Sequence, residues 1–184
     1  MENKYSIVFI PNTTIINEVK KMKIQLSDKI GWFNSKNSTA HITICEFSSS
    51  EIDVIKNQIS RITANFSPFE VKLVDYDSYP NGAFFIKLSE NSKDDLKKIM
   101  KNLTATLIIK NMYKSNDPHL SIARKLDAER LKIASILFQK TELTFLCDRV
   151  YLRKFNPEIK QFEIIDSFLF KSEKSNDNIQ FNLF

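Results

Sequence analysis

Two short stretches of this sequence place a histidine two residues before a hydroxyl side chain. They read Ala40-His41-Ile42-Thr43-Ile44 and Pro118-His119-Leu120-Ser121-Ile122, and they contain the only two histidines of the chain. About one residue in seven is Ser or Thr, so a hydroxyl would follow both histidines at this spacing by chance in roughly 2% of such sequences. A single histidine near an apolar run is usually structural, but the repetition indicates a shared chemical role.

In each stretch apolar and polar residues alternate, which is typical of a β-strand. Residues two apart on a strand point to the same face, so each strand presents an imidazole and a hydroxyl side by side. Two imidazoles facing one cleft could act as the base and the acid of an in-line displacement at phosphorus, because the unperturbed pKa of histidine is near 6.5. The hydroxyls could donate hydrogen bonds to the non-bridging oxygens.

The elements around these stretches alternate between strands and helices. Strands are predicted at residues 5–10, 41–47, 69–74, 83–88, around His119, and at 143–155 and 162–170. The first helix begins at a Thr13 or Thr14 cap and ends before Gly31, and the second follows a capping box at Ser48–Glu51. The third helix starts near Ser92, and Asp127 caps the fourth.

The order of these elements is a degenerate internal repeat. Each half contains a strand, a helix, a polar loop, a histidine strand and a capped helix, and no linker separates the halves. A pseudo-twofold arrangement places the histidine strands opposite each other across a cleft. We therefore predict one bilobal domain over residues 1–170, followed by a polar tail over 171–184, of which Ile179 to Phe184 could dock or pair.

Composition and charge are those of a soluble globular protein that is mildly basic. The chain has 184 residues, 42% of them hydrophobic and 27% charged, a net charge of +5 and a pI of about 9.1. We expect no signal peptide and no membrane helix. Cys45 and Cys147 lie in apolar strand contexts without a CxxC motif, so we expect reduced, buried thiols of a cytoplasmic protein. We also expect a monomer.

The scarcity of glycine excludes two nucleotide-binding motifs. Gly31 and Gly82 are the only glycines, whereas a P-loop and a dinucleotide fingerprint both need several glycines close together. Two histidines without a cluster of cysteines or carboxylates also argue against a zinc site. The sequence therefore predicts neither a cofactor nor a bound metal.

The motifs His41-Ile42-Thr43 and His119-Leu120-Ser121 resemble those of the 2H phosphoesterase superfamily, in particular its LigT-like, 2′-5′ RNA ligase and cyclic phosphodiesterase branch. The separation of the motifs and the order of elements also fit, so the resemblance covers residues 5–170. It implies an α+β, bilobal fold with two pseudo-symmetric lobes. Each lobe would have an antiparallel-rich sheet with helices packed outside, and the cleft would lie at the centre.

The resemblance also implies a function and a set of site residues. The activity would be a metal-independent phosphoesterase that opens 2′,3′-cyclic phosphates or cleaves and joins 2′-5′ linkages. His41 and His119 would be the acid–base pair, and Thr43 and Ser121 would hold the phosphate. For hydrolysis, His119 would activate water and His41 would protonate the leaving oxygen, with the roles exchanged in the reverse direction.

The second motif continues to Arg124 in a form that resembles the His-x-Thr-x-x-Arg pattern of the ligase-like branch. This makes Arg124 a candidate contact to the phosphate or the substrate. Strand alternation points a residue five positions after His119 to the other face, unless the strand bends at its end. At the matching position of the first motif stands Glu46.

Aromatic residues in loops or beside turns could stack on a base: Trp32, Phe33, Tyr79 and Phe84. Core packing is the competing interpretation for each of them. The expected partners are RNA ends or small nucleotides with a cyclic or 2′-5′ phosphodiester, and no membrane. A non-catalytic module that binds nucleotides or RNA in the same cleft is the alternative function, and a structural protein with coincidental motifs is a further one.

Overall fold

The computed structural model describes residues 2–173. Its strands are β1 (Asn3–Phe9), β2 (Ile42–Ser49), β3 (Phe69–Ser78), β4 (Phe84–Leu88), β5 (Tyr113–Lys114), β6 (Leu120–Ala123), β7 (Glu142–Cys147), β8 (Arg149–Asn156) and β9 (Gln161–Leu169). Its helices are α1 (Thr13–Ile30), α2 (Ile52–Thr63), α3 (Glu90–Thr106) and α4 (Ala128–Leu137).

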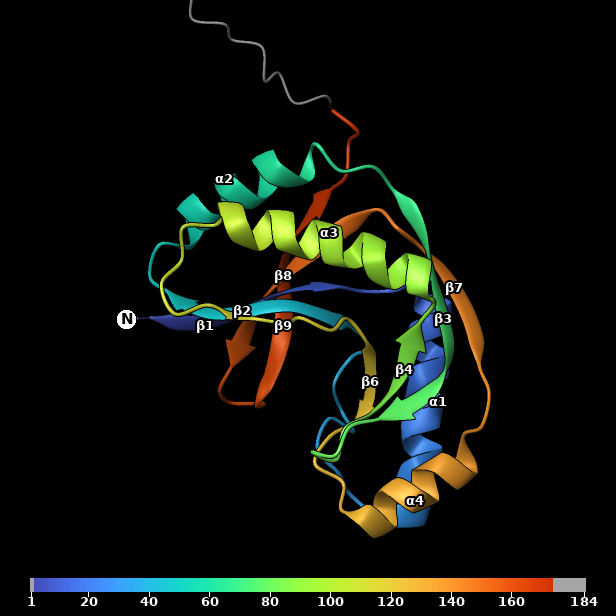
Figure 1. Ribbon diagram of the computed structural model, residues 1–184. Coiled ribbons are helices and arrows are strands. Elements are labelled where there is room, and N and C mark those ends of the chain that lie inside the picture. The colour runs from blue at the N-terminus through green and yellow to red at the C-terminus, as the bar shows by residue number, and fades with distance from the viewer. Residues whose placement is uncertain (1, 174–184) are drawn as a thin grey trace, which may run out of the picture.

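The strands form a single nine-stranded sheet in the order β7-β3-β4-β6-β2-β1-β8-β9, with β5 paired to β2. Every strand pair within it is antiparallel. The sheet curls into a C whose open side faces left in Figure 1, and the helices lie outside the curl. One face of the sheet is therefore covered by helices, while the other lines the inside of the curl.

The internal repeat is visible in the topology. The units β1-α1-β2-α2 and β4-α3-β6-α4 follow the same order, and their histidine strands β2 and β6 are neighbours at the centre of the sheet. The halves are joined where Ile42 pairs with Leu120. The two lobes thus share one continuous sheet, which the order of elements along the chain does not reveal.

The predicted strand over residues 143–155 is wrong in one respect, because it consists of two strands. The break falls at Asp148, whose carboxylate binds Arg149 and whose carbonyl accepts from the N–H of Phe170. The two strands lie at distant positions in the sheet, since β7 pairs with β3 and β8 pairs with β1. Strand β3 is also longer than predicted, because a bulge with Asp75 at φ 52 lets it continue to Ser78.

Two predicted caps at helix starts are wrong. Asn12, not Thr13 or Thr14, caps α1, with its Oδ1 accepting from the N–H of Ile15. The capping box before α2 does not form, because Glu51 is itself the N-cap and its N–H donates to Ser49 Oγ. In both cases the observed geometry differs from the prediction by one to three residues within a polar run.

The other helix signals are mostly confirmed. Helix α3 begins slightly before the predicted start, with Ser89 as the cap and Ser92 buried in its first turn. Asp127 caps α4 by accepting from the N–H of Arg130. Gly31 ends α1 at φ 74, a conformation that suits glycine.

Both cysteines are buried in the core, as expected. Burial raises the pKa of Cys45 to about 12, so its thiol stays protonated at neutral pH. No helix within residues 2–173 is long and apolar enough to cross a membrane. The predicted tail starts inside the described part, where the N–H groups of Ser172 and Glu173 donate to Phe66 and Ala64, but its remainder, with the segment from Ile179 to Phe184, lies outside the described residues.

Candidate active site

The two histidine motifs meet at the joint between β2 and β6. Ile42 and Leu120, the central residues of the motifs, pair directly and are 0% exposed on the helix-covered side of the sheet. Their neighbours in sequence therefore point to the inside of the curl. All four candidate side chains lie on this face and are partly exposed: His41, Thr43, His119 and Ser121.

The antiparallel register fixes how these side chains are arranged. Extending the antiparallel register from Ile42 opposite Leu120 would place His41 beside Ser121 and Thr43 beside His119. The two imidazoles are then diagonal neighbours, and such neighbours have Cβ atoms about 7 Å apart. Each histidine is thus next to the hydroxyl of the other motif as well as its own.

Each imidazole forms the same type of hydrogen bond, to the backbone carbonyl two residues before it in the chain. His41 Nδ1 lies 2.6 Å from the carbonyl oxygen of Thr39, and His119 Nδ1 lies 2.8 Å from that of Asp117. A carbonyl oxygen only accepts, so Nδ1 carries a hydrogen and Nε2 is the nitrogen left for proton transfer. The two motifs therefore share the same imidazole tautomer, with the hydrogen on Nδ1.

Aromatic rings and an acidic residue surround His119. Its ring centroid is 4.7 Å from that of Phe85 and 5.5 Å from that of Tyr79. The Tyr79 hydroxyl donates to the carboxylate of Asp117, which also pairs with Lys93 at 2.7 Å. Burial lowers the pKa of His119, while the carbonyl and carboxylate of Asp117 partly oppose that shift.

Cations surround His41 instead. Burial and the positive charges of Arg153, Lys23 and Arg124 lower its pKa to about 3, against a weaker opposing effect of the bond to Thr39. The His41 imidazole is therefore neutral at pH 7 in the free protein. The three positive charges that act on His41 would also attract an anion to this face of the sheet.

Arg153 is a further candidate site residue, which the sequence did not indicate. It lies on β8 opposite Ser6 of β1, and Ser6 in turn lies opposite Glu46 of β2. Its side chain is 5% exposed, its Nε donates to Ser6 Oγ at 3.0 Å, and its guanidinium lies 5.1 Å from the ring centroid of Phe162. Burial lowers the pKa of Arg153 to about 10, so it remains charged at neutral pH.

Lys23 holds the loop that precedes His41. Its ammonium group, on a side chain that is 2% exposed, donates to the carbonyls of Ser35 and Ser38 and to Ser38 Oγ. The same loop supplies the Thr39 carbonyl that orients His41. Burial, with the nearby Arg124, lowers the pKa of Lys23 to about 8. The sequence predicts a solvated helix face for the run Lys20-Lys21-Met22-Lys23, and for Lys23 this is wrong, because its stem packs into the protein while its ammonium group binds the loop.

Arg124 lies just past the end of β6, where the strand no longer imposes alternation. A bulge falls between Ser121 and Ala123, and Arg124 then pairs with Asn34 through a bridge whose N–H···O distance is 3.2 Å. Because the bulge and the end of the strand interrupt the alternation, alternation no longer predicts that Arg124 points away from the face of His119. The positive charge of Arg124 helps to lower the pKa of both His41 and His119, so Arg124 lies close enough to influence both rings.

The aromatic candidates divide between core and surface. Phe33 and Phe84 are 2% and 1% exposed, so neither is available to stack on a base. Tyr79 contacts His119, and Trp32 is 65% exposed in the loop after α1. Tyr113, which the sequence did not single out, is also 65% exposed and lies opposite Glu46.

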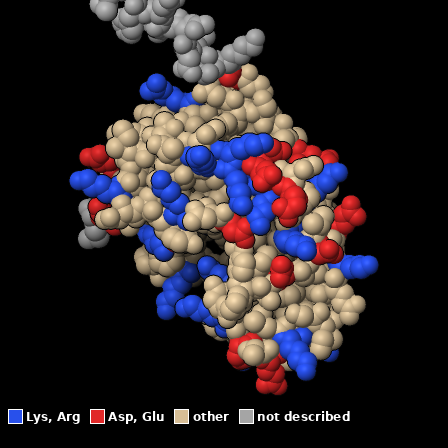
Figure 2. Space-filling view, in the orientation of Figure 1, with Lys and Arg blue, Asp and Glu red and all other residues tan. Residues whose placement is uncertain are grey.

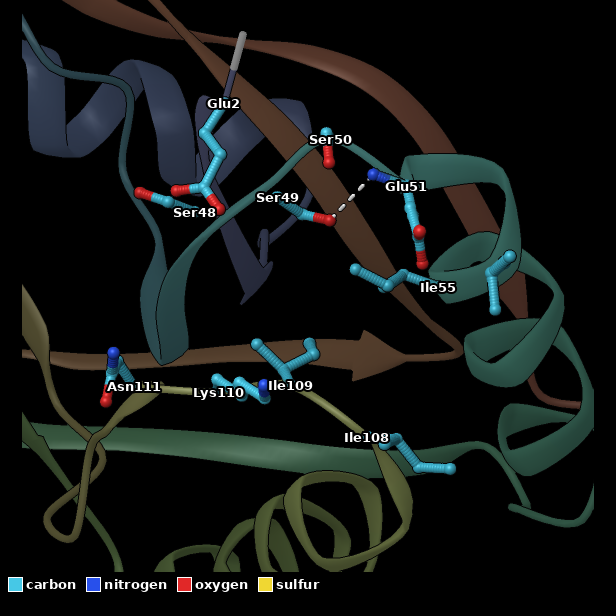
Figure 3. A pocket seen from close by; sticks show the side chains of 11 residues that line it. Glu2, Ser48, Ser49, Ser50, Glu51, Ile55, Ile108, Ile109, Lys110 and Asn111 are labelled. Carbon is cyan, nitrogen blue, oxygen red and sulfur yellow. Dashed lines mark hydrogen bonds between the residues drawn. The ribbon is translucent and has the colours of Figure 1, made fainter.

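The face in Figure 2 is hollowed on the open side of the curl, and Lys and Arg side chains gather around the hollow. Within residues 2–173, no group of three His, Cys, Asp or Glu side chains is placed to hold a metal ion. A separate hollow of about 530 Å³ lies between the start of α2 and the segment after α3 (Figure 3). It is lined by serines, aliphatic residues and the polar residues Glu2, Glu51, Lys110 and Asn111, and by neither histidine, so the two imidazoles lie elsewhere.

A known protein family matches most of this chain. Residues 11–157 match the model of the 2′-5′ RNA ligase superfamily. The chain belongs to this superfamily. Its α+β class and LigT-like fold are confirmed by solved structures of low sequence identity, and no curated protein sequence matches it closely.

Solved structures align with this chain over nearly its whole length. Protein TT0787 of Thermus thermophilus has 15% identity and a TM-score of 0.68, with 93% of this chain and 100% of that chain covered. Escherichia coli LigT in complex with 3′-AMP has 13% identity and a TM-score of 0.66, with coverage of 92% and 99%. Both structures share the overall fold of this chain.

Proposed function

We propose that this protein is a metal-independent phosphoesterase acting on RNA-type phosphodiesters, with 2′,3′-cyclic phosphodiesterase or 2′-5′ RNA ligase-like activity. The observation that carries the proposal is the pairing of Ile42 with Leu120, which gathers two imidazoles and two hydroxyls on one face. LigT of Escherichia coli has been crystallised with 3′-AMP and with ATP, which supports a nucleotide as the substrate.

In the hydrolytic direction, a water oxygen forms a bond to phosphorus while a neutral imidazole takes the water proton at Nε2. The bond between phosphorus and one ribose oxygen breaks, and the second imidazole donates its proton to that oxygen. The product is a ribose phosphomonoester beside a free hydroxyl, and solvent restores the two protonation states. Thr43 and Ser121 donate to the non-bridging oxygens, and Arg124 and Arg153 balance the charge that develops there.

The charges around the two rings favour His41 as the base and His119 as the acid in hydrolysis. Burial and three cations lower the pKa of His41 to about 3, whereas burial lowers the pKa of His119 against the opposing effect of Asp117. This is the reverse of the assignment that the family resemblance implies. An anionic substrate raises the pKa of both rings by offsetting the cations. Substrate binding therefore increases the protonated fraction of His119, which is the form that donates the proton.

The proposal is tested by incubating the protein with a panel of substrates in the presence of EDTA and analysing the products by mass spectrometry. The panel contains 2′,3′-cyclic mononucleotides, 2′-5′-linked dinucleotides, RNA with a cyclic phosphate end and ADP-ribose cyclic phosphate. We expect turnover of at least one class, with EDTA having no effect. Activity that EDTA abolishes and a divalent ion restores would contradict metal independence.

The His41→Ala and His119→Ala variants are the controls for the same panel. If both variants fold and turn over substrate as the wild type does, these side chains are not the catalysts. Tight nucleotide binding without turnover by the wild type would instead favour the non-catalytic binding module.

A further inference from the structure

A hollow of about 450 Å³ lies beside the candidate active site, and of its lining residues only Arg124 has a role in the mechanism above. It is lined by Asn34, Asn81, Ala83, Arg124 and Lys125, and we call it the outer pocket. Three separate loops converge there: the loop after α1, the turn before β4 and the segment after β6. Its volume is within the range of pockets that hold small ligands.

The walls of the outer pocket are fixed by backbone contacts. The N–H of Leu126 donates to the carbonyl of Gly82 at 2.9 Å, and a Cβ added to Gly82 would lie 2.2 Å from the carbonyl oxygen of Leu126. The N–H of Ala83 donates to Asn81 Oδ1 at 3.2 Å, which holds that side chain in the turn. Only a glycine allows the turn and the segment after β6 to approach so closely.

Arg124 connects the outer pocket to the active site. It lines the pocket, its N–H donates to the carbonyl of Asn34, and its charge acts on both His41 and His119. Between Ser121, beside the proposed phosphate site, and Arg124 there are three residue steps, roughly 10 Å along a strand. A ligand in the outer pocket would therefore lie next to the scissile phosphate without overlapping it.

The side chains of the outer pocket suit a nucleotide better than an apolar ligand. Asn34 and Asn81 carry amides, which can hydrogen-bond to the edge of an unpaired base. Arg124 and Lys125 carry positive charges that suit a second phosphate. Trp32, two residues before Asn34, is 65% exposed and offers an aromatic surface on which a base can stack.

We infer that the outer pocket binds the nucleotide adjacent to the scissile phosphate, so that the preferred substrate is an oligoribonucleotide end rather than a free cyclic mononucleotide. Lys125 contacts the second phosphate, and Trp32 with the two asparagine amides contacts its base. This inference rests on the proposed phosphoesterase function for its catalytic readout, but the binding itself can be measured separately.

The catalytic test compares two substrates of the same chemistry. One is a 2′,3′-cyclic mononucleotide, and the other is a dinucleotide that ends in the same cyclic phosphate. We expect Trp32→Ala and Lys125→Gln each to lower kcat/KM for the dinucleotide about tenfold, with no change for the mononucleotide. Gln at position 125 keeps the backbone strain of a non-glycine residue at φ 57, so only the charge changes. Lys97→Gln, on the exposed side of α3, is the matched control for loss of one charge.

The binding test uses Trp32, which is the only tryptophan of the chain, as a fluorescent reporter. In the His119→Ala variant, which prevents turnover, we expect the dinucleotide to change the Trp32 emission at saturation and the mononucleotide to leave it unchanged. Equal effects of the pocket variants on both substrates, or dinucleotide binding that leaves the emission unchanged, would overturn the inference. If the wild type turns over neither substrate but the dinucleotide still changes the Trp32 emission, the proposed function would be overturned and the outer pocket would stand.

Discussion

Ile42 and Leu120 lie directly opposite each other on β2 and β6, and both are completely buried. This pair joins the two halves of the sheet and also sets the face on which each motif presents its histidine and hydroxyl. A shift of one residue in either strand would turn that strand's imidazole into the core. The geometry of the candidate site therefore depends on the register at this one position.

The two imidazoles should act as a unit. If they transfer protons at Nε2, His41→Ala and His119→Ala should each lower kcat at least about 100-fold. The double variant should lose much less than the product of the two effects. Thr43→Ala and Ser121→Ala should be milder, because each removes one hydrogen bond to the phosphate. Turnover of a 2′,3′-cyclic nucleotide, with circular dichroism to verify folding, measures all five variants; strictly multiplicative losses would argue against a shared role.

The assignment of acid and base can be tested with the leaving group. An aryl phosphodiester that releases nitrophenolate needs no proton from the enzyme, so loss of the acid should matter little for this substrate. We expect His119→Ala to recover most of the lost kcat with the aryl substrate, and His41→Ala to recover little. Recovery by His41→Ala alone would restore the assignment implied by the family resemblance.

Arg153 should control both anion binding and the titration of His41. Arg153→Met removes a buried charge while keeping a long side chain, so the pKa of His41 should rise and inorganic phosphate should bind at least about tenfold more weakly. Imidazole NMR signals during a pH titration, together with calorimetry, measure the two effects. Lys154→Met, the next residue on β8 and on the opposite face, is the control and should change neither. A pKa of His41 that does not move in Arg153→Met would exclude this coupling.

Acid should destabilise the fold partly through His41. Its pKa is about 3 in the folded protein and near 6.5 in the unfolded chain, so between these values the unfolded state binds more protons. The free energy of unfolding should then fall as the pH drops from about 6.5 towards 3, by at most about 1.4 kcal/mol per pH unit from this group. His41→Gln should show a shallower fall in urea titrations between pH 7 and 5. Identical slopes for the two proteins would show that His41 titrates normally.

The two glycines should differ in their tolerance of alanine. Both have positive φ, 74 for Gly31 and 84 for Gly82, so each Gly→Ala change has a strain cost of about 1–2 kcal/mol. At Gly31 an added Cβ meets nothing within 4 Å, whereas at Gly82 it collides with the backbone of Leu126. Gly82→Ala should therefore cost about 2–5 kcal/mol in total and Gly31→Ala only the strain. Urea denaturation of both variants measures the difference, and equal costs would mean that the segment after β6 moves aside.

The sequence by itself determined the features that depend on local patterns. Strand alternation gave the face shared by each histidine and its hydroxyl, Gly31 gave the end of α1, and Asp127 gave the start of α4. The order of elements also gave the internal repeat. These features follow from residues close together in the chain, so a pattern within one segment is sufficient to predict them.

Only the tertiary structure decided which strands are neighbours, and with them the electrostatics of the site. Arg153 lies 112 positions after His41 in the chain, yet it lowers the pKa of that imidazole because β8 pairs with β1 and β1 pairs with β2. Lys23 reaches the same region only because α1 packs beside the loop that it binds. Charges act through space and strands pair over long distances in sequence, so neither effect leaves a pattern in the residues around the histidines.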